Sequence, residues 1–451
     1  MLKNVFHRFS SSWILSEKVL AEKDRVINEI HLNEVKRQKE GIELIASENY
    51  PSRACLAALS THFNNKYAEG YPGARYYGGT KYVDELENET KRRALDLFNL
   101  NPKEWGVNVQ ALSGSPANLA VYTALLNPGD TFMGLKLSDG GHLTHGHKLK
   151  AKKVSSSSIF WNSEQYTLNP KTSLIDFEKL EQKAKELHPK LIVAGASAYP
   201  RFIDFKEFRK ICNQTNSILM SDVAHYSGLI AAGLYPSPFE YSDIVTTTTH
   251  KTLRGPRGAL VFFKKEYEKK INSAIFPTLQ GGPHLHQIAA IAVALKEAKS
   301  EDFRNYQKQV LKNIKALCDY LQQNNIDIVS GGTDSHMALI DLRRYNVDGA
   351  RVEFVLDQMG ITTNKNTIPG GSVGLRVGSP AMTSRGLDEN DFKKIAEFIV
   401  KGVKISKEIK SKSGKKLSDF KKLAKNNDNI REIKKTVTSF ASKFPLPGYD
   451  D

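Results

Sequence analysis

The chain has 451 residues, of which 40% are hydrophobic and 25% are charged, as in a soluble globular protein long enough for a large core and a second domain. No stretch approaches the roughly 18 consecutive apolar residues of a membrane-spanning helix, so we predict no membrane span. The three cysteines, Cys55, Cys212 and Cys318, have neither metal-ligand spacing nor the density of a disulfide framework, and we expect them to be reduced.

The formal net charge is +16, and half of this excess lies in residues 401–451, where 14 Lys and Arg stand against 6 Asp and Glu. Such a surface is usually a solvated basic face. It can also attract polyanions, nucleic acid among them, and charge by itself does not choose between these partners.

The N-terminus has the composition of a targeting segment. Residues 1–16 contain Lys3, Arg8, several serines and bulky apolar side chains, and no acid precedes Glu17. This pattern is typical of an amphipathic mitochondrial transit peptide, and an ordinary ragged N-terminus is the alternative. We therefore predict a transit peptide over 1–16 and a location in the mitochondrial matrix, followed by an N-terminal arm over 17–64.

A loop rich in tyrosine and glycine occupies residues 64–79. Its glycines and Pro72 exclude a continuous helix or strand. Four tyrosines together with Glu69 and Arg75 in an irregular loop indicate a functional site, and a surface loop that uses tyrosines for packing is the alternative.

A Gly-Ser turn at residues 113–116 precedes an apolar helical stretch. We expect Ser115 to cap this helix and Pro116 to take its first position. A helix N-terminus of this kind offers free backbone N–H groups and a positive dipole end to a phosphate, although every capped helix shares these features.

Further along, residues 139–146 form a glycine-rich loop that contains His142 and His145. A zinc site would need further ligands at suitable spacing, and the sequence shows none, so we predict no metal site.

Residues 151–265 alternate apolar strand runs with charged helical stretches. This alternation predicts βαβ units and a mainly parallel sheet with ligands at the carboxyl ends of its strands. The run 217–222 ends in Asp222, which either caps the next helix or pairs with the ring nitrogen of a cofactor.

Five β-branched residues at 245–249 predict a strand, after which His250 and Lys251 come before the chain breaks at Gly255 and Pro256. A lysine at the end of a buried strand is costly unless it is neutral, paired or covalently used. A desolvated amine is what pyridoxal phosphate needs to form a Schiff base, and a solvated lysine after an ordinary strand is the alternative.

The rest of the chain predicts a smaller α+β domain from about Ser300, with strands at 326–330 and 337–341, a helix at 349–358 and further helices from Asn390 onward. A glycine-rich string, 363–380, contains Arg376, whose planar guanidinium fork suits a carboxylate.

The fourteen residues 245–258 closely resemble the cofactor-lysine segment of serine hydroxymethyltransferases, and matches to that family recur from about residue 41 to the C-terminus. The resemblance implies a fold-type I pyridoxal phosphate transferase of the α/β class. Its large domain, over 65–299, would hold a seven-stranded, mostly parallel sheet, and a small α+β domain would cover 300–451.

The resemblance also implies roles for single residues. Catalytic roles fall to Lys251, Glu69 as acid/base, His250 and Tyr77. The cofactor would be held by Ser113, Gly114, Ser115, His142, Ser197, Asp222, His225, Lys251 and Arg257, with Tyr67, Gly281 and Gly282 supplied by a neighbouring subunit. The substrate would be bound by Ser47, Tyr77 and Arg376. Folate would be contacted by Glu69, Tyr76, Leu137, Gly141 and Asn366.

The implied reaction moves a one-carbon unit from serine to tetrahydrofolate, giving glycine and 5,10-methylenetetrahydrofolate. Since the site takes residues from a neighbour, at least a homodimer is implied, and eukaryotic relatives pair dimers into tetramers. The basic C-terminal region would then also suit folate polyglutamates.

One departure from the resemblance concerns residues 367–374, which form a shorter span than the folate-covering loop of the family. Two alternatives follow: a pyridoxal phosphate aldolase that uses folate poorly, and a weakly active or non-catalytic subunit that binds an active paralogue or RNA. The residues Glu69, Asp222, Lys251 and Arg376 are all present, which argues against an inactive protein.

Overall fold

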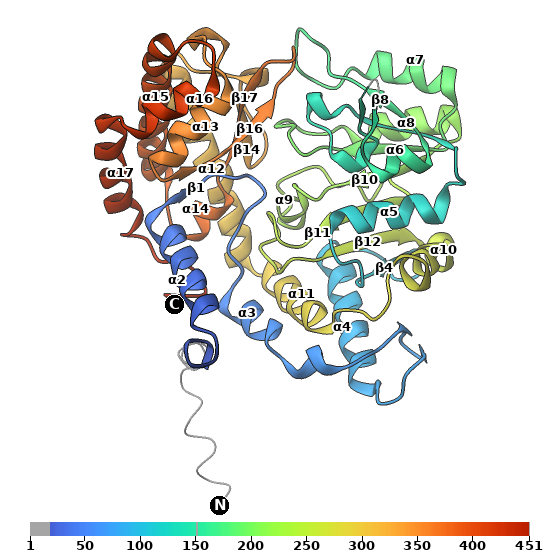
Figure 1. The fold of residues 1–451 in the computed structure, drawn as a ribbon. Coiled ribbons are helices and arrows are strands. Elements are labelled where there is room, and N and C mark those ends of the chain that lie inside the picture. Colours follow the sequence, from blue (N-terminus) through green and yellow to red (C-terminus); the bar gives the residue numbers. More distant parts are fainter. Residues whose placement is uncertain (1–18, 150–151, 451) are drawn as a thin grey trace, which may run out of the picture.

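The structure is a computed structural model that describes residues 19–149 and 152–450 (Figure 1). The predicted transit peptide, 1–16, lies outside the described residues. In the described ranges, every helix is too short or too polar to span a membrane.

A seven-stranded sheet forms the centre of the larger part of the molecule. Its strands, in spatial order, are β4 (Trp105–Asn108), β12 (Ala259–Lys264), β11 (Ile244–Thr248), β10 (Ile218–Asp222), β9 (Leu191–Gly195), β5 (Thr131–Leu135) and β8 (Asn162–Tyr166). Only β12 runs antiparallel to its neighbours, β11 and β4, within this sheet. The predicted fold, an α/β protein with a mostly parallel seven-stranded sheet, is confirmed.

Both faces of the central sheet are buried, because strand alternation sends successive side chains into two different cores. On β9, Ile192 and Ala194 belong to one core, and Leu191 and Val193 belong to the other. The covering helices are α4 (Lys81–Leu97), α5 (Gly114–Leu125), α6 (Ser156–Phe160), α7 (Phe177–Leu187), α8 (Phe205–Thr215), α9 (Ser227–Ala231), α10 (Glu268–Ser273) and α11 (Leu285–Ala298).

A second, antiparallel sheet has its own core. Its strands, in spatial order, are β13 (Asp327–Ile328), β14 (Met337–Asp341), β17 (Val373–Gly378) and β16 (Asn364–Thr367). The helices around it are α12 (Glu301–Gln323), α13 (Gly349–Gln358), α14 (Pro380–Ser384), α15 (Glu389–Ser413), α16 (Leu417–Lys425) and α17 (Asp428–Ala441). The strand predicted over 326–330 stops at Ile328, because Ser330 takes a left-handed φ of 58° at the start of a Gly-Gly turn.

The N-terminal arm joins the two parts. Helix α2 (Arg25–Glu40) leads into β1 (Ile42–Glu43), which pairs in parallel with β15 (Ile361–Thr362), and α3 (Arg53–Leu59) then packs on α11 (Figure 1). Arg385 holds the end of α2 and the C-terminal segment in place. Its fully buried guanidinium donates hydrogen bonds to the carbonyl groups of Gln38, Lys39, Gly41, Ala441, Phe444 and Pro445.

Candidate active site

A cavity of about 330 Å³ opens at the carboxyl ends of β9, β10 and β11. This is the edge at which open parallel sheets bind ligands. Twelve residues singled out in the sequence line it: Ser47, Ser113, Gly114, Ser115, His142, Ser197, Asp222, His225, His250, Lys251, Arg257 and Arg376. Four further lining residues were not predicted: Asn118, Ala196, Ala224 and Thr248.

Lys251 lies three residues beyond the end of β11. Its Nζ donates a hydrogen bond of 3.0 Å to Thr248 Oγ1. Burial lowers the pKa of the amine to about 8, and the positive charges of Arg376 and Arg257 act in the same direction, against the opposing charge of Asp222. About a tenth of the amine is therefore neutral at pH 7, a few hundredfold more than for an ordinary lysine, as a nucleophilic lysine requires.

Asp222 is the last residue of β10, and three donors surround its carboxylate. Oδ2 accepts hydrogen bonds from Asn118 Nδ2 at 2.8 Å and from His145 Nε2 at 2.9 Å, and Oδ1 accepts one from the Ala224 backbone N–H at 3.1 Å. Burial by itself raises the pKa of Asp222, but the interactions with His145, His142 and Asn118 outweigh it and hold the pKa well below its ordinary value. Asp222 is a fixed negative charge on the cavity wall.

Neither Asn118 nor His145 is assigned a role by sequence analysis. Asn118 lies on the buried, otherwise apolar face of α5, where its Oδ1 also accepts a hydrogen bond of 2.8 Å from Thr246 Oγ1. A lone amide within an apolar helical run was the signal available, because a buried amide needs partners. For His145, the sequence suggests only a zinc-ligand role, for which it lacks further ligands. The described residues contain no group of three or more His, Cys, Asp or Glu side chains placed to hold a metal ion.

Helix α5 presents its N-terminus to the cavity, but it begins earlier than predicted. Ser113, not Ser115, is the N-cap, and Gly114 is the first helical residue. A Cβ at Gly114 would lie 2.9 Å from Thr248 Cγ2, so glycine lets the helix start pack directly on the end of β11. The orphan N–H groups of this first turn, the two serine hydroxyls and Arg257 form a set of donors suited to a phosphate.

Arg376 projects from β17 on the opposite side of the cavity. Its Nη1 donates a hydrogen bond of 2.7 Å to the Ser197 carbonyl, and its Nε donates one of 3.2 Å to Asn364 Oδ1. The residue is only 9% exposed, and burial lowers its pKa to about 10. The guanidinium remains charged at neutral pH and is held in one orientation, as binding of a carboxylate requires.

Three histidines line the cavity as neutral rings. Burial is the largest cause in each case: it lowers the pKa of His142 to about 4, that of His250 to about 3, and that of His225 well below its usual range. The charge of Lys251 lowers all three further. His142 Nδ1 lies 2.7 Å from Thr144 Oγ1, which fixes the orientation of the ring.

A second group of predicted residues lies together elsewhere on the chain and does not line the cavity: Tyr67, Glu69, Tyr76, Tyr77, Gly281 and Gly282. A Cβ built on Gly281 would lie 3.3 Å from Glu69 Oε1, and one on Gly282 would lie 3.1 Å from the Tyr67 ring. The ring centroids of Tyr67 and Tyr77 are 5.1 Å apart. Tyr67 is 56% exposed and Tyr77 is 44% exposed.

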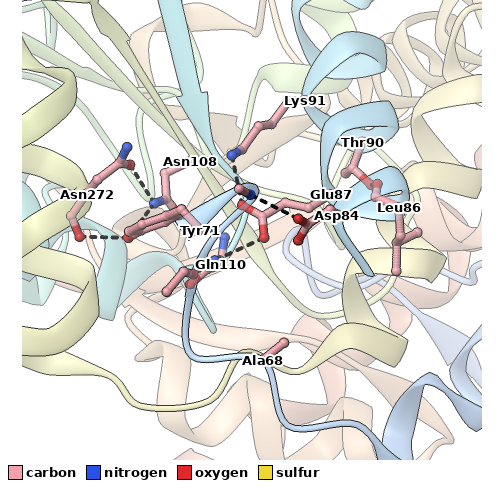
Figure 2. Close-up of polar contacts among 12 residues, drawn as sticks. Ala68, Tyr71, Asp84, Leu86, Glu87, Thr90, Lys91, Asn108, Gln110 and Asn272 are labelled. Atoms are coloured by element: carbon pink, nitrogen blue, oxygen red, sulfur yellow. Dashed lines mark hydrogen bonds and ion pairs between the residues drawn. The ribbon is translucent and has the colours of Figure 1, made fainter. Parts of the chain in front are cut away.

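A buried polar network holds the loop that carries this second group. The Arg75 guanidinium, 3% exposed, donates to Asp84 at 2.9 Å and to the fully buried Glu87 at 2.7 Å, and also to the carbonyl groups of Ala68 and Gly70. These carbonyls flank Glu69. Figure 2 shows Glu87 between Lys91 and Gln110, beside the hydrogen-bonded Tyr71, Asn108 and Asn272.

The three other residues predicted to contact folate also lie outside the cavity lining. Leu137 is in a short 3₁₀ turn, Gly141 is buried against the Leu135 carbonyl, and Asn366 is on β16. The short span after Asn366 closes as a hairpin turn, in which the Ile368 N–H donates to the Ser372 carbonyl at 2.9 Å.

The chain is similar in sequence to a known protein family. The family model for serine hydroxymethyltransferase matches residues 20–399. A serine hydroxymethyltransferase of Caenorhabditis elegans is 50% identical over 465 residues, covering 98% of this chain and 92% of that protein. The cytosolic serine hydroxymethyltransferase of Oryctolagus cuniculus is 49% identical (98% and 97% covered), and serine hydroxymethyltransferase 3, chloroplastic, of Arabidopsis thaliana is also 49% identical (95% and 84%).

Proposed function

The chain belongs to the serine hydroxymethyltransferase family, and on that premise we propose that its cavity holds pyridoxal phosphate and serves one-carbon transfer between serine and tetrahydrofolate. The products in this direction are glycine and 5,10-methylenetetrahydrofolate. One observation carries the proposal: a lysine of lowered pKa, an ionised carboxylate and a buried arginine, Lys251, Asp222 and Arg376, line the same cavity.

The residues present fit the cofactor. The first turn of α5, with Ser113, Ser115 and Arg257, would hold the phosphate, and Lys251 would bind the aldehyde carbon. Asp222 would accept a hydrogen bond from the protonated ring nitrogen, and its three donors keep it ionised for that task. When bound, pyridoxal phosphate supplies an electron sink for negative charge that develops at the substrate α-carbon.

The substrate would lie between the cofactor and Arg376. The guanidinium, oriented by the Ser197 carbonyl and Asn364, would bind the α-carboxylate together with Ser47. His142 would pack flat on the cofactor ring, and Glu69 would exchange a proton with the substrate hydroxyl group. This last role requires Glu69 to reach a cavity that it does not line in its own chain.

A second copy of the chain would resolve this mismatch. A neighbouring cavity of about 560 Å³ shares Ser47, His250 and Arg257 with the cofactor cavity and opens beside it. Tyr67 and Tyr77, on the same loop as Glu69, are about half exposed and are therefore available for contact with a second copy of the chain. We infer a homodimer in which each chain places Tyr67, Glu69 and the Gly281–Gly282 turn at the cavity of its partner, with two such dimers forming a tetramer.

The two hydrophobic cores support the proposed division into a large domain, 65–299, and a small domain, 300–451. The arm, 17–64, would belong to both, since β1 pairs with β15 and α3 packs on α11.

The first test is the visible absorbance of the purified protein, alone, then with glycine, then with glycine and tetrahydrofolate. We expect a cofactor band that is lost in Lys251→Ala and that changes when folate is added to the glycine complex. A wild-type protein that carries no such band would refute the cofactor site.

The closed turn at 368–372 favours a second candidate function, cleavage of β-hydroxy amino acids without folate. Ile368 is fully buried against Ala198 and Leu339, so the turn is anchored rather than extended over the site. A glycine complex whose spectrum ignores folate, together with cleavage of a β-hydroxy amino acid, would select this candidate.

Two further proposals concern location and partners. The composition of residues 1–16 supports import into the mitochondrial matrix. Because the relatives include proteins named cytosolic and chloroplastic, an import assay with isolated mitochondria is the test of this location.

The basic surplus of residues 401–451 supports contact with RNA or with an active paralogue. Steep weakening of binding with added salt would mark the RNA contact.

A further inference from the structure

A pair of buried histidines lies at the wall of the cavity, and only one of them, His225, is among the residues that the family resemblance assigns to the cofactor. His225 follows β10 and lines the cavity, and His336 immediately precedes β14 in the other sheet. His336 is fully buried, and its Nε2 lies 3.3 Å from His225 Nδ1. The two ring planes are inclined to each other by 15° with their centroids 5.5 Å apart, and the 3.3 Å contact joins one nitrogen of each ring, so a ring N–H of one can donate to the lone pair of the other.

Both rings are neutral near pH 7. Burial lowers the pKa of His336 to about 3, with Arg376 and Lys251 contributing and the Ala46 backbone opposing. The groups that face His225 are Lys251, Arg376, His336 and His142, and all of them lower its pKa in addition to burial. A neutral imidazole has one N–H and one lone pair, so the two rings can share only one proton along the His225–His336 contact. The tautomer of one ring therefore fixes that of the other.

The contact also connects the two sheets. Residues Leu339 on β14 and Arg376 on β17 face each other in register, and the carbonyl of His336 accepts a hydrogen bond of 3.1 Å from the Ser379 N–H just beyond β17. His336 is thus held by the sheet that carries Arg376 while its ring touches a residue of the cofactor wall.

We propose that His336 is a positioning residue whose hydrogen bond to His225 fixes the ring orientation and tautomer that His225 presents to the cofactor. This inference rests on the proposed function, because His225 acts on the reaction only if pyridoxal phosphate occupies the cavity. The simplest competing role is packing between the two sheets.

The test separates these roles with two substitutions. His336→Leu removes the ring nitrogen, whereas His336→Gln keeps a polar group near the position of Nε2. His188→Asn serves as the control, because His188 is exposed at the end of α7 in a left-handed conformation that asparagine tolerates. The first readout is the ¹⁵N spectrum of the histidine rings in cofactor-free protein, assigned with His225→Gln and His336→Gln.

We expect single, fixed tautomers for His225 and His336 in the wild type and tautomer-averaged His225 signals in His336→Leu. In the loaded protein, we expect His336→Leu to shift the pH midpoint of the cofactor absorbance by about one pH unit and to lower kcat about tenfold, with little change in KM for serine. His336→Gln should recover most of both changes, and His188→Asn should match the wild type.

Averaged His225 tautomers in the wild type would overturn the proposal, even if His336→Leu does not fold. So would unchanged His225 signals in His336→Leu, or equal defects in the leucine and glutamine variants, which would indicate packing. A failure of the proposed function would look different from a failure of this proposal. If the proposed function is wrong, the wild type lacks the Lys251-dependent absorbance band, but the ¹⁵N spectrum of the cofactor-free protein still tests the His225–His336 contact.

Discussion

The amide of Asn118, on the buried face of α5, donates a hydrogen bond of 2.8 Å to the carboxylate of Asp222 at the end of β10. The same helix presents its N-terminus to the cavity four residues earlier. One helix therefore positions both the proposed phosphate site and the proposed partner of the ring nitrogen. The spacing between these two sites is set by a rigid element rather than by a loop.

Replacing Asn118 should weaken cofactor binding. Asn118→Leu removes one of three donors to Asp222, so the carboxylate is less firmly oriented toward the position of the ring nitrogen, and its pKa rises. Hydrogen bonds to charged groups contribute about 1.5–3 kcal/mol, so we expect pyridoxal phosphate to bind roughly ten- to a hundredfold more weakly. A titration of cofactor-free protein followed by absorbance measures this. Asn305→Ala, on the exposed surface of α12, is the control, and equal affinities in the two variants would contradict the prediction.

The rate of cofactor addition should follow the titration of Lys251. With a pKa of about 8, the neutral amine rises about tenfold per pH unit below pH 8 and levels off above it. Arg376→Gln removes a positive charge that lowers this pKa, so its rate profile should move to higher pH. Stopped-flow absorbance between pH 6 and about 10 records both profiles. A profile with no midpoint near 8 in the wild type would show that another group controls the reaction.

Breaking the Arg75 network should destabilise the protein and disturb Glu69. Arg75→Met leaves the buried Glu87 with Lys91 as its remaining cation and removes the donor to the Ala68 and Gly70 carbonyl groups, which costs about 3 kcal/mol of unfolding free energy. Arg75→Lys keeps the charge and loses the fork, so it should cost less. Arg92→Met, on the exposed face of α4, the helix that carries Glu87, should cost no more than about 1 kcal/mol. Denaturant unfolding compares the three variants, and similar losses for Arg75→Met and Arg92→Met would refute the network's role.

Two inactive variants should restore activity when they are combined. Lys251→Ala and Glu69→Gln disable different halves of the proposed shared site, so a mixed dimer retains one intact site. Random pairing of equal amounts gives about a quarter of the wild-type activity per dimer. Co-expressed chains with separable tags test this. Lys251→Ala with Arg376→Leu is the matched control, because both residues line the same cavity and their mixed dimers contain no intact site. Activity no higher in the first mixture than in the control would exclude the shared site.

Local pattern alone determined much of this protein. The alternation of apolar strands and charged helices predicted the parallel sheet, and the β-branched run before Lys251 placed that lysine at the carboxyl edge of a strand. These patterns can be recognised in a single sequence because side-chain periodicity and chain breakers depend on only a few neighbouring residues. The resemblance then supplied twelve of the sixteen residues that line the cavity.

Only the tertiary structure decided the supporting contacts. Asn118 and Asp222 are 104 positions apart, and His225 and His336 are 111 apart. A buried polar side chain finds its partner through packing, so its local sequence resembles that of any other core position. The start of α5 was misplaced by two residues because serine at 113 and at 115 are equally good caps, and close packing of Gly114 on β11 selected the first. The sequence likewise could not show that Glu69 and Lys251 lie apart within one chain. Their separation depends on the position of the Tyr67–Tyr77 loop, which Arg75, Glu87 and Gln110 hold in place.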